Sequence, residues 1–171
     1  MNTGQFITIV NNFYANNRRS FAWRETITPY NVFVSEVMLQ QTQTYRVAPK
    51  FDAFIQYLPD FKTLADAPFS QVLSLWKGLG YNRRALNLQR AAQMVVDNYN
   101  NILPDDPRLV DELPGIGPAT ASSIVCFAFN KPTVFIETNI RTVFIYHFFP
   151  CRTDVHDKEL IPLIQDTVDQ I

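Results

Sequence analysis

The sequence predicts an all-α fold of roughly nine or ten short helices. Three observations lead to this prediction. Apolar residues recur at i, i+3 and i+4 along most of the 171 residues. Prolines and glycines stand where these periodic segments begin and end. The alternating pattern of a half-buried strand is missing at useful length, and only the short apolar run 133–136 departs from helical spacing.

Prolines and glycines set the expected helix boundaries. Pro29 suits the first turn of a helix that runs to about residue 43. Pro49 fits either the first turns of the next helix or a bend between helices, and Pro59 ends that apolar run. Pro68 opens a helix that glycines close. The other expected helices are an amphipath at 6–14, a longer one at 83–99, a short helix capped by Asp106, a small-residue helix from 118, and 138–149 and 155–171.

Composition excludes several classes of protein. Hydrophobic residues at 47% and charged residues at 18% are an ordinary globular balance. Two cysteines cannot build a disulfide framework or a four-thiolate metal site. No run of about 18 apolar residues predicts a membrane span, and the N-terminus lacks the basic region of a secretory signal, so a cytoplasmic protein is expected. The near-neutral total hides a balance of +4 over residues 1–100 and −5 over 101–171.

The strongest local signal is a glycine-containing turn between two expected helices. Gly115 and Gly117 permit positive φ and the close approach of another backbone. The next helix would point free N–H groups and its positive dipole end at a ligand on the turn, which suits a DNA phosphate. A tight turn between packed helices explains the same residues without a ligand. The turn is Leu113, Pro114, Gly115, Ile116 and Gly117, and small residues follow at Ala119, Thr120, Ala121 and Ser122.

A glutamate stands in the otherwise mostly apolar helix expected at 29–43. The simpler of two interpretations is that Glu36 occupies a solvent-exposed helix position. In a cleft, burial would favour its protonated form and make it a candidate general acid. The polar residues that follow would read base edges or wedge into a stacked duplex, or would form only an exposed helix end. They are Gln40, Gln41, Thr42 and Gln43.

A second acidic residue follows the apolar run 133–136. Glu137 stands at the expected start of a helix, where an acidic side chain usually serves as a cap or dipole partner. Facing Glu36 across a cleft, it would complete the pair of carboxylates that cleaves glycosidic bonds. The segment 76–85, with Gly80 and Tyr81, fits a helix end, a turn and a basic helix start, and its tandem Arg83 and Arg84 could bind phosphate. The two histidines show no metal-ligand spacing.

These segments, in this order, resemble the helix-hairpin-helix base-excision DNA glycosylases. The MutY-type adenine glycosylase branch is the nearest match, and endonuclease III is a more distant relative. The matching stretches are FAWR, PY leading into SEVMLQQTQ, WKGLGYNRRALNL, LPGIGPATA and ETNIR, which cover about residues 5 to 150. The resemblance implies a six-helix barrel domain at 22–133, with the helix-hairpin-helix at about 106–130. It also implies a partial second helical domain from 1–21 and 134–171.

The resemblance also assigns roles to residues. Glu36 matches the glutamate that protonates the adenine ring so that the base leaves neutral. Gln41 matches the glutamine that enters the duplex when the base is flipped out. Glu137 stands at the position of the catalytic aspartate, with Asn139 two residues on as a further catalytic residue. The expected DNA-binding residues are Gln40, Gln41, Thr42, Gly80, Tyr81, Arg83, Leu113, Gly115, Gly117, Ala119 and Thr120.

Three positions depart from the family pattern. Glu137 is one methylene longer than the family aspartate, and a displacement of about 1 Å can cost about a hundredfold in rate. Ala119 replaces the lysine of the strand-cleaving lyases, so Schiff-base chemistry is not expected. Asn82 replaces the tyrosine that often follows the GLGY sequence.

Two segments of the family are missing from the sequence. One carries four cysteines that ligate a [4Fe–4S] cluster, and the other is a domain that recognises oxidised guanine. With Cys126 and Cys151 alone, no cofactor is expected in this chain, and a cluster would need a longer native chain. The uncapped end of the last expected helix favours truncation. The expected partner is double-stranded DNA with a mismatched or oxidised base pair, bound by a monomer at a bacterial nucleoid, with no membrane.

Three functions fit these residues. The first is a monofunctional glycosylase that removes adenine opposite oxidised guanine or guanine. The second is a non-catalytic helix-hairpin-helix DNA-binding homologue, favoured by Glu137 and the missing cluster segment. The third is a glycosylase for another base, such as a mismatched thymine or an oxidised pyrimidine, left open by Asn82 and Ala119.

Overall fold

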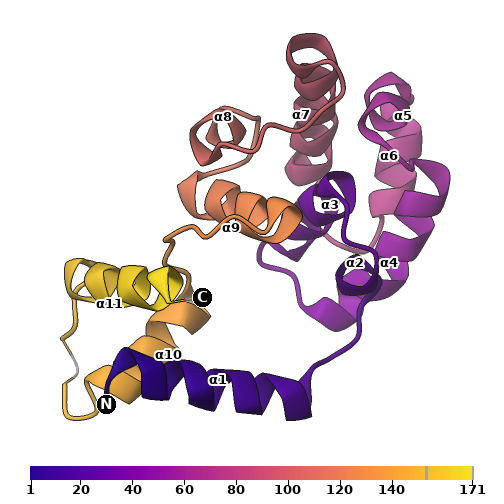
Figure 1. The fold of residues 1–171 in the computed structure, drawn as a ribbon. Coiled ribbons are helices and arrows are strands. Elements are labelled where there is room, and N and C mark those ends of the chain that lie inside the picture. The colour runs from indigo at the N-terminus through magenta and orange to yellow at the C-terminus, as the bar shows by residue number, and fades with distance from the viewer. Residues whose placement is uncertain (153, 171) are drawn as a thin grey trace. The chain divides into compact units, whose positions relative to one another are not determined.

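A computed structural model describes residues 1–152 and 154–170, and it assigns eleven α-helices and no strand within those ranges (Figure 1). The all-α prediction is therefore confirmed. The chain divides into two compact units, one of residues 20–131 and one that joins 1–19 to 132–171. The predicted division placed the boundaries at 22 and 133.

The unit of residues 20–131 is built around one apolar core. The core gathers side chains that are at most 9% exposed, among them Trp76, Phe33, Phe51, Phe54 and Leu88. The pairs α3 and α9, α8 and α9, and α5 and α7 pack against each other within it. Its helices are α2 (Ala22–Glu25), α3 (Pro29–Leu39), α4 (Thr44–Tyr57), α5 (Phe61–Asp66), α6 (Phe69–Trp76), α7 (Arg83–Tyr99), α8 (Pro107–Asp111) and α9 (Pro118–Phe129).

Local sequence explains how α3 begins. Thr28 is its N-cap and accepts a hydrogen bond from the Asn31 N–H, and Pro29 occupies the first turn as predicted. Most of α3 is buried, and the Tyr30 hydroxyl donates to the Leu58 carbonyl at 2.6 Å. Burial, with the charge of Asp60, raises the pKa of Tyr30, so the phenol remains a neutral donor. These contacts fix α3 in the core of its unit.

The smaller unit comprises α1 (Thr3–Asn17), α10 (Thr138–Phe148) and α11 (Asp157–Asp169). Phe6 of α1 lies with its ring 4.8 Å from that of Phe144, centroid to centroid. Val155, Leu160 and Ile164 complete this second core.

Several boundary predictions need correction. The short helices α2 and α5 were not predicted. The helix predicted to reach residue 43 ends at Leu39, so the glutamines that follow lie in a loop. Pro49 lies inside the continuous helix α4 rather than at a bend. The helix predicted at 155–171 spans Asp157–Asp169, and residue 171 lies outside the described residues. No helix in the described part of the chain is long and apolar enough to cross a membrane.

Candidate functional site

The predicted turn joins α8 to α9 and makes a helix–hairpin–helix. Gly115 has φ +80°, a conformation that favours glycine. A methyl group at this position would also lie 2.8 Å from Cβ and Nδ2 of Asn87, so the hairpin approaches α7 as closely as glycine allows. Gly117 has φ −114° and nothing within 4 Å of an added Cβ. Of the two glycines that permit a positive φ, Gly115 therefore adopts one and Gly117 does not.

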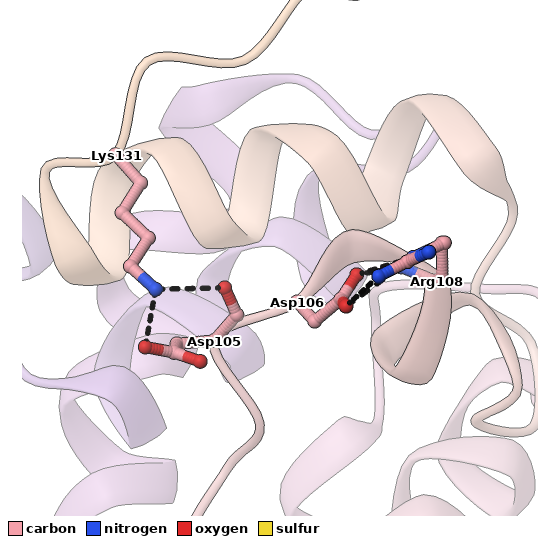
Figure 2. Close-up of polar contacts among 4 residues, drawn as sticks. All are labelled: Asp105, Asp106, Arg108 and Lys131. Atoms are coloured by element: carbon pink, nitrogen blue, oxygen red, sulfur yellow. Dashed lines mark hydrogen bonds and ion pairs between the residues drawn. The ribbon is translucent and has the colours of Figure 1, made fainter.

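One ion pair joins the other end of the helix–hairpin–helix, and a second lies within the start of α8 (Figure 2). Lys131, just after α9, pairs with the carboxylate of Asp105, just before α8. Asp106 caps α8 by accepting from the Arg108 N–H at 2.9 Å, and its carboxylate also pairs with the Arg108 guanidinium. The hydrogen bonds from Arg108 lower the pKa of Asp106 to about 2. The entry to α8 and the exit of α9 are thus held together by charge.

The N-terminus of α9 lacks a side-chain cap. Gly117 is its N-cap residue and has no side chain, and Pro118 has no N–H. The next two N–H groups, of Ala119 and Thr120, have no partner within the helix. Ala119 is exposed and Thr120 half-buried. An uncapped helix start with its positive dipole end favours an anion.

The unit of residues 20–131 contains a pocket of about 510 Å³, and Thr120 near the start of α9 is one of its lining residues. Its only ionisable lining groups besides Tyr81 are the two arginines of α7, which make it basic. Five of the predicted DNA-binding residues come together here. The lining residues are Gln40, Gln41, Tyr81, Arg83, Arg84, Asn87 and Thr120.

Arg84 holds the two loops that border the pocket. Its Nη1 donates to the carbonyls of Val37, Met38 and Gln40, at 3.1, 3.0 and 2.6 Å. Its Nη2 donates to the Thr42 hydroxyl at 2.9 Å, and to the carbonyls of Leu79 and Gly80 at 3.2 and 3.3 Å. The sequence suggested Arg84 as a phosphate contact, whereas in the structure both terminal nitrogens of its guanidinium, Nη1 and Nη2, are engaged by the protein itself.

The two bordering loops are strained. Gln41 has φ +53° and Tyr81 has φ +49°, values that residues with a side chain rarely adopt. Such conformations persist where surrounding contacts over-determine them, and they cluster at ligand sites. Tyr81 is 66% exposed. An exposed aromatic ring held beside a basic pocket is suited to stacking on a nucleic-acid base.

The predicted acid Glu36 lies on α3, one helical turn before Gln40. It is half-buried, and its Oε2 lies 2.7 Å from the Ser123 hydroxyl of α9. Ser123 is 6% exposed, and its oxygen also lies 2.9 Å from the Thr120 carbonyl. Glu36 is therefore a fixed polar group on a buried helix and not the solvated helix position that was the alternative.

Glu137 and Asn139 belong to the smaller unit. Glu137 is the N-cap of α10, where its Oε1 accepts from the Ile140 N–H at 2.9 Å. The Asn139 amide donates to Oε2 of Glu137 at 3.2 Å. The capping role that the sequence suggested is thus present, and Asn139 orients the same carboxylate.

The remaining predicted residues support the loops and the hairpin. Leu113 is 2% exposed and its side chain belongs to the core. The Gln40 amide donates to the Gly115 carbonyl at 3.2 Å, which ties the α3–α4 loop to the hairpin. The Gly80 carbonyl accepts from the Trp76 indole N–H at 3.0 Å. Sequence reasoning missed Ser123 and Asn87, since their partners are distant in sequence.

The chain's cysteines do not fit an iron–sulfur cluster. A cluster takes four ligands, whereas the chain holds Cys126, half-buried on α9, and Cys151, exposed in the other unit. The described residues contain no group of three or more His, Cys, Asp or Glu side chains that could hold a metal ion.

The hairpin, its uncapped helix and the basic pocket place this chain among helix-hairpin-helix proteins. Residues 34–163 match the HhH-GPD superfamily of base excision DNA repair proteins. The match covers most of the chain, and the chain belongs to this superfamily.

Three known proteins illustrate the relationship. An adenine DNA glycosylase of Buchnera aphidicola subsp. Baizongia pistaciae is 35% identical over 164 residues, which are 96% of this chain and 46% of that protein. A thermostable thymine-DNA glycosylase structure has a TM-score of 0.84 and 26% identity, over 96% of this chain and 77% of that one. A non-covalent endonuclease III–DNA complex has a TM-score of 0.79 and 20% identity, over 98% and 78%, and shows the common fold. The chain thus spans less than half the length of the curated relative.

Proposed function

We propose that this chain carries the base-flipping and acid-catalytic residues of a monofunctional DNA glycosylase that removes a mispaired adenine. The observation that carries the proposal is the pocket lined by Gln41, Tyr81 and Arg83, with the half-buried Glu36 on the helix that leads into it. The relative named adenine DNA glycosylase, 35% identical, supports adenine as the base. Double-stranded DNA with a mismatched or oxidised base pair is the proposed partner.

The hairpin supplies the phosphate contact. The N–H groups at the start of α9 bind a DNA phosphate without a side-chain charge, and Arg83 adds a positive charge at the pocket. Gln41 enters the duplex as the base leaves it, and Tyr81 stacks on a neighbouring base. These contacts hold the target nucleotide out of the stack.

The carboxylates supply the chemistry. Glu36 donates a proton to a ring nitrogen of the base while the N-glycosidic bond breaks, and the bonding electron pair leaves with the neutral base. Glu137, oriented by Asn139, stabilises the positive charge that develops on the sugar. A water molecule then adds to the sugar carbon and gives its proton to the Glu36 carboxylate, which returns to the acid form. Ala119 provides no amine, so the strand is not cleaved through a Schiff base.

Single-turnover assays on duplexes with adenine opposite oxidised guanine or guanine test the proposal. We expect base release by the wild type and none by Glu36→Gln, with equal DNA binding by both. The same null result for both proteins, with DNA still bound, would support the non-catalytic homologue and reject the enzyme. The matched control is Asp52→Asn, an exposed carboxylate of α4, which should leave the rate unchanged.

Thymine is the second candidate for the base that is removed. The structural relative with a TM-score of 0.84 is a thymine-DNA glycosylase. Release of thymine from a mismatch, with adenine duplexes left intact and Glu36→Gln inactive, would keep the enzyme and change its substrate.

A further inference from the structure

We propose that Ser123 is the positioning residue of Glu36: its buried hydroxyl donates to Oε2 of the carboxyl group and holds that group in place. The proposal rests on the proposed function of Glu36 as the general acid. Ser123 and Glu36 stand 87 residues apart and meet where α9 packs on α3, at 2.7 Å.

The single hydroxyl proton decides how Ser123 acts. Its oxygen lies within reach of two acceptors, Oε2 of Glu36 at 2.7 Å and the Thr120 carbonyl at 2.9 Å. A serine has one proton to donate. The Thr120 carbonyl lies inside α9, where the backbone N–H four residues later is its partner. The contact with Glu36 is the shorter one, so the proton is assigned to Glu36. Once Glu36 has given up its own proton, this bond also becomes charge-assisted.

Anchoring one oxygen restrains the whole carboxyl group. With Oε2 held by a side chain that is 6% exposed, the carboxyl group cannot rotate freely about its last bond. When Glu36 gives its proton to the base, the negative charge spreads over both carboxylate oxygens, and the Ser123 hydroxyl stabilises the share on Oε2. Ser123 therefore acts through Glu36 and touches no substrate atom.

The surroundings allow the contribution of this hydroxyl to be isolated. α9 carries no Asp, Glu, Lys or Arg between Pro118 and Phe129. Arg84 contacts α3 through its backbone, where it donates to the carbonyls of Val37 and Met38. Replacing Ser123 by alanine removes one oxygen and changes no charge.

Ser35 provides a matched control. It is also a buried serine, and its hydroxyl donates to the carbonyl three residues earlier, Val32, at 2.9 Å. It stands on α3 next to Glu36 in sequence. Ser35→Ala therefore deletes the same kind of hydroxyl from the same core without deleting the bond to the carboxylate.

The first measurement needs no enzymatic activity. The chain contains five glutamates, Glu25, Glu36, Glu112, Glu137 and Glu159, so a ¹³C-labelled glutamate side chain is resolved by NMR and assigned with Glu36→Gln. In Ser123→Ala we expect the titration midpoint of the Glu36 carboxyl to move up by about one pH unit, because the ionised form loses a donor. Ser123→Thr, which keeps the hydroxyl, and Ser35→Ala should leave it in place. An unchanged or lowered midpoint in Ser123→Ala overturns the proposal.

The second measurement is single-turnover base release from the duplexes named above. We expect Ser123→Ala to lower the rate constant about tenfold, with DNA affinity unchanged within about twofold, and Ser123→Thr to restore it. A wild-type rate in Ser123→Ala overturns the positioning role. An inactive wild type would instead reject the proposed function, while the NMR titration would still decide whether Ser123 holds Glu36.

Discussion

The Nη1 of Arg84 lies 2.6 Å from the Gln40 carbonyl oxygen, and this contact links α7 to the loop in which Gln41 adopts a positive φ. The same guanidinium reaches the Gly80 carbonyl, beside the second strained residue, Tyr81. One side chain thus holds both loops of the pocket. The shape of the pocket depends on an arginine that does not itself need to touch the ligand.

Replacing Arg84 by lysine should open both loops. An ammonium group cannot reproduce the planar fork that serves several carbonyls at once. We expect Arg84→Lys to lower the free energy of unfolding by about 2 kcal/mol, since hydrogen bonds from a charged donor are lost. DNA affinity should fall as well, because Gln41 and Tyr81 are no longer held. Urea unfolding and a fluorescence binding titration measure the two effects.

Arg83 is the matched control for this change. It is exposed and lines the pocket. Arg83→Ala should change stability by less than about 0.5 kcal/mol. It should weaken DNA binding and reduce the slope of log K against log salt by about one. Equal stability losses in the Arg83 and Arg84 variants would contradict the division of labour that the contacts indicate.

The two glycines of the hairpin should respond differently to alanine. Gly115→Ala places a methyl group 2.8 Å from Asn87 at φ +80°, so both a collision and backbone strain arise. We expect it to cost about 2 kcal/mol and to displace the hairpin. Thermal unfolding and DNA binding measure this.

Gly117→Ala serves as the comparison, because an added Cβ meets nothing within 4 Å. We expect its unfolding temperature to match the wild type. Its DNA affinity should nevertheless fall if a phosphate of the DNA backbone binds close to this position. A Gly117→Ala protein that is as unstable as Gly115→Ala would show that the hairpin conformation differs from the one described.

Short-range signals made most of the fold predictable. Pro29, Pro118 and the cap Asp106 start helices where the sequence placed them. The helix α5 was not predicted because it is only six residues long, although Asp60 accepts from the Thr63 N–H as a regular N-cap. The end of α3 at Leu39 was missed for a different reason. The turn at Gln41 requires a positive φ, which long-range contacts from Arg84 support. No local sequence pattern predicts those contacts.

The site residues on local motifs were also predictable, and their long-range partners were not. Motif matching selected Gln41, Tyr81 and Thr120, and these residues line one pocket. It also selected Glu36, but the partner of Glu36 was out of reach, because Ser123 stands among small residues that close helix packing explains equally well. A pairing across 87 residues depends on how two helices pack, and side-chain spacing within either helix does not encode it.

The capping carboxylate of α8 should contribute an acid-labile part of stability. Arg108 lowers the pKa of Asp106 from 3.8 to about 2. A lowered pKa in the folded state means that the contribution is present above about pH 4 and is lost as the pH falls towards 2. Asp106→Asn keeps a capping side chain and removes this charge. Urea unfolding between pH 2 and 5 should therefore show a shallower loss of stability in the variant.

Part of the acid dependence should persist in Asp106→Asn. In the smaller unit, a hydrogen bond from Arg152 lowers the pKa of Glu159, which titrates in the same direction. An Asp106→Asn protein with the full wild-type acid dependence would show that the bond to Arg108 contributes nothing to folding.

Shortening Glu137 tests the departure from the family pattern. As the N-cap of α10, Glu137 accepts from the Ile140 N–H at 2.9 Å. Aspartate is a preferred N-cap residue, so Glu137→Asp should leave the stability of α10 unchanged or raised. It also restores the carboxylate length that the resemblance assigns to this position. On the proposed function, a displacement of about 1 Å is worth up to about a hundredfold in rate. We therefore expect faster base release by Glu137→Asp in single-turnover assays.

Glu137→Gln separates charge from length in the same assay. It keeps the length of the side chain and an oxygen that can cap α10, but it cannot balance a positive sugar. We expect it to fold like the wild type and to lose activity. If Glu137→Asp were slower than the wild type while Glu137→Gln were inactive, the longer carboxylate would be the form suited to this chain's own substrate. If both variants kept the wild-type rate, Glu137 would be a helix cap alone, and stabilisation of the sugar cation would have to come from another group.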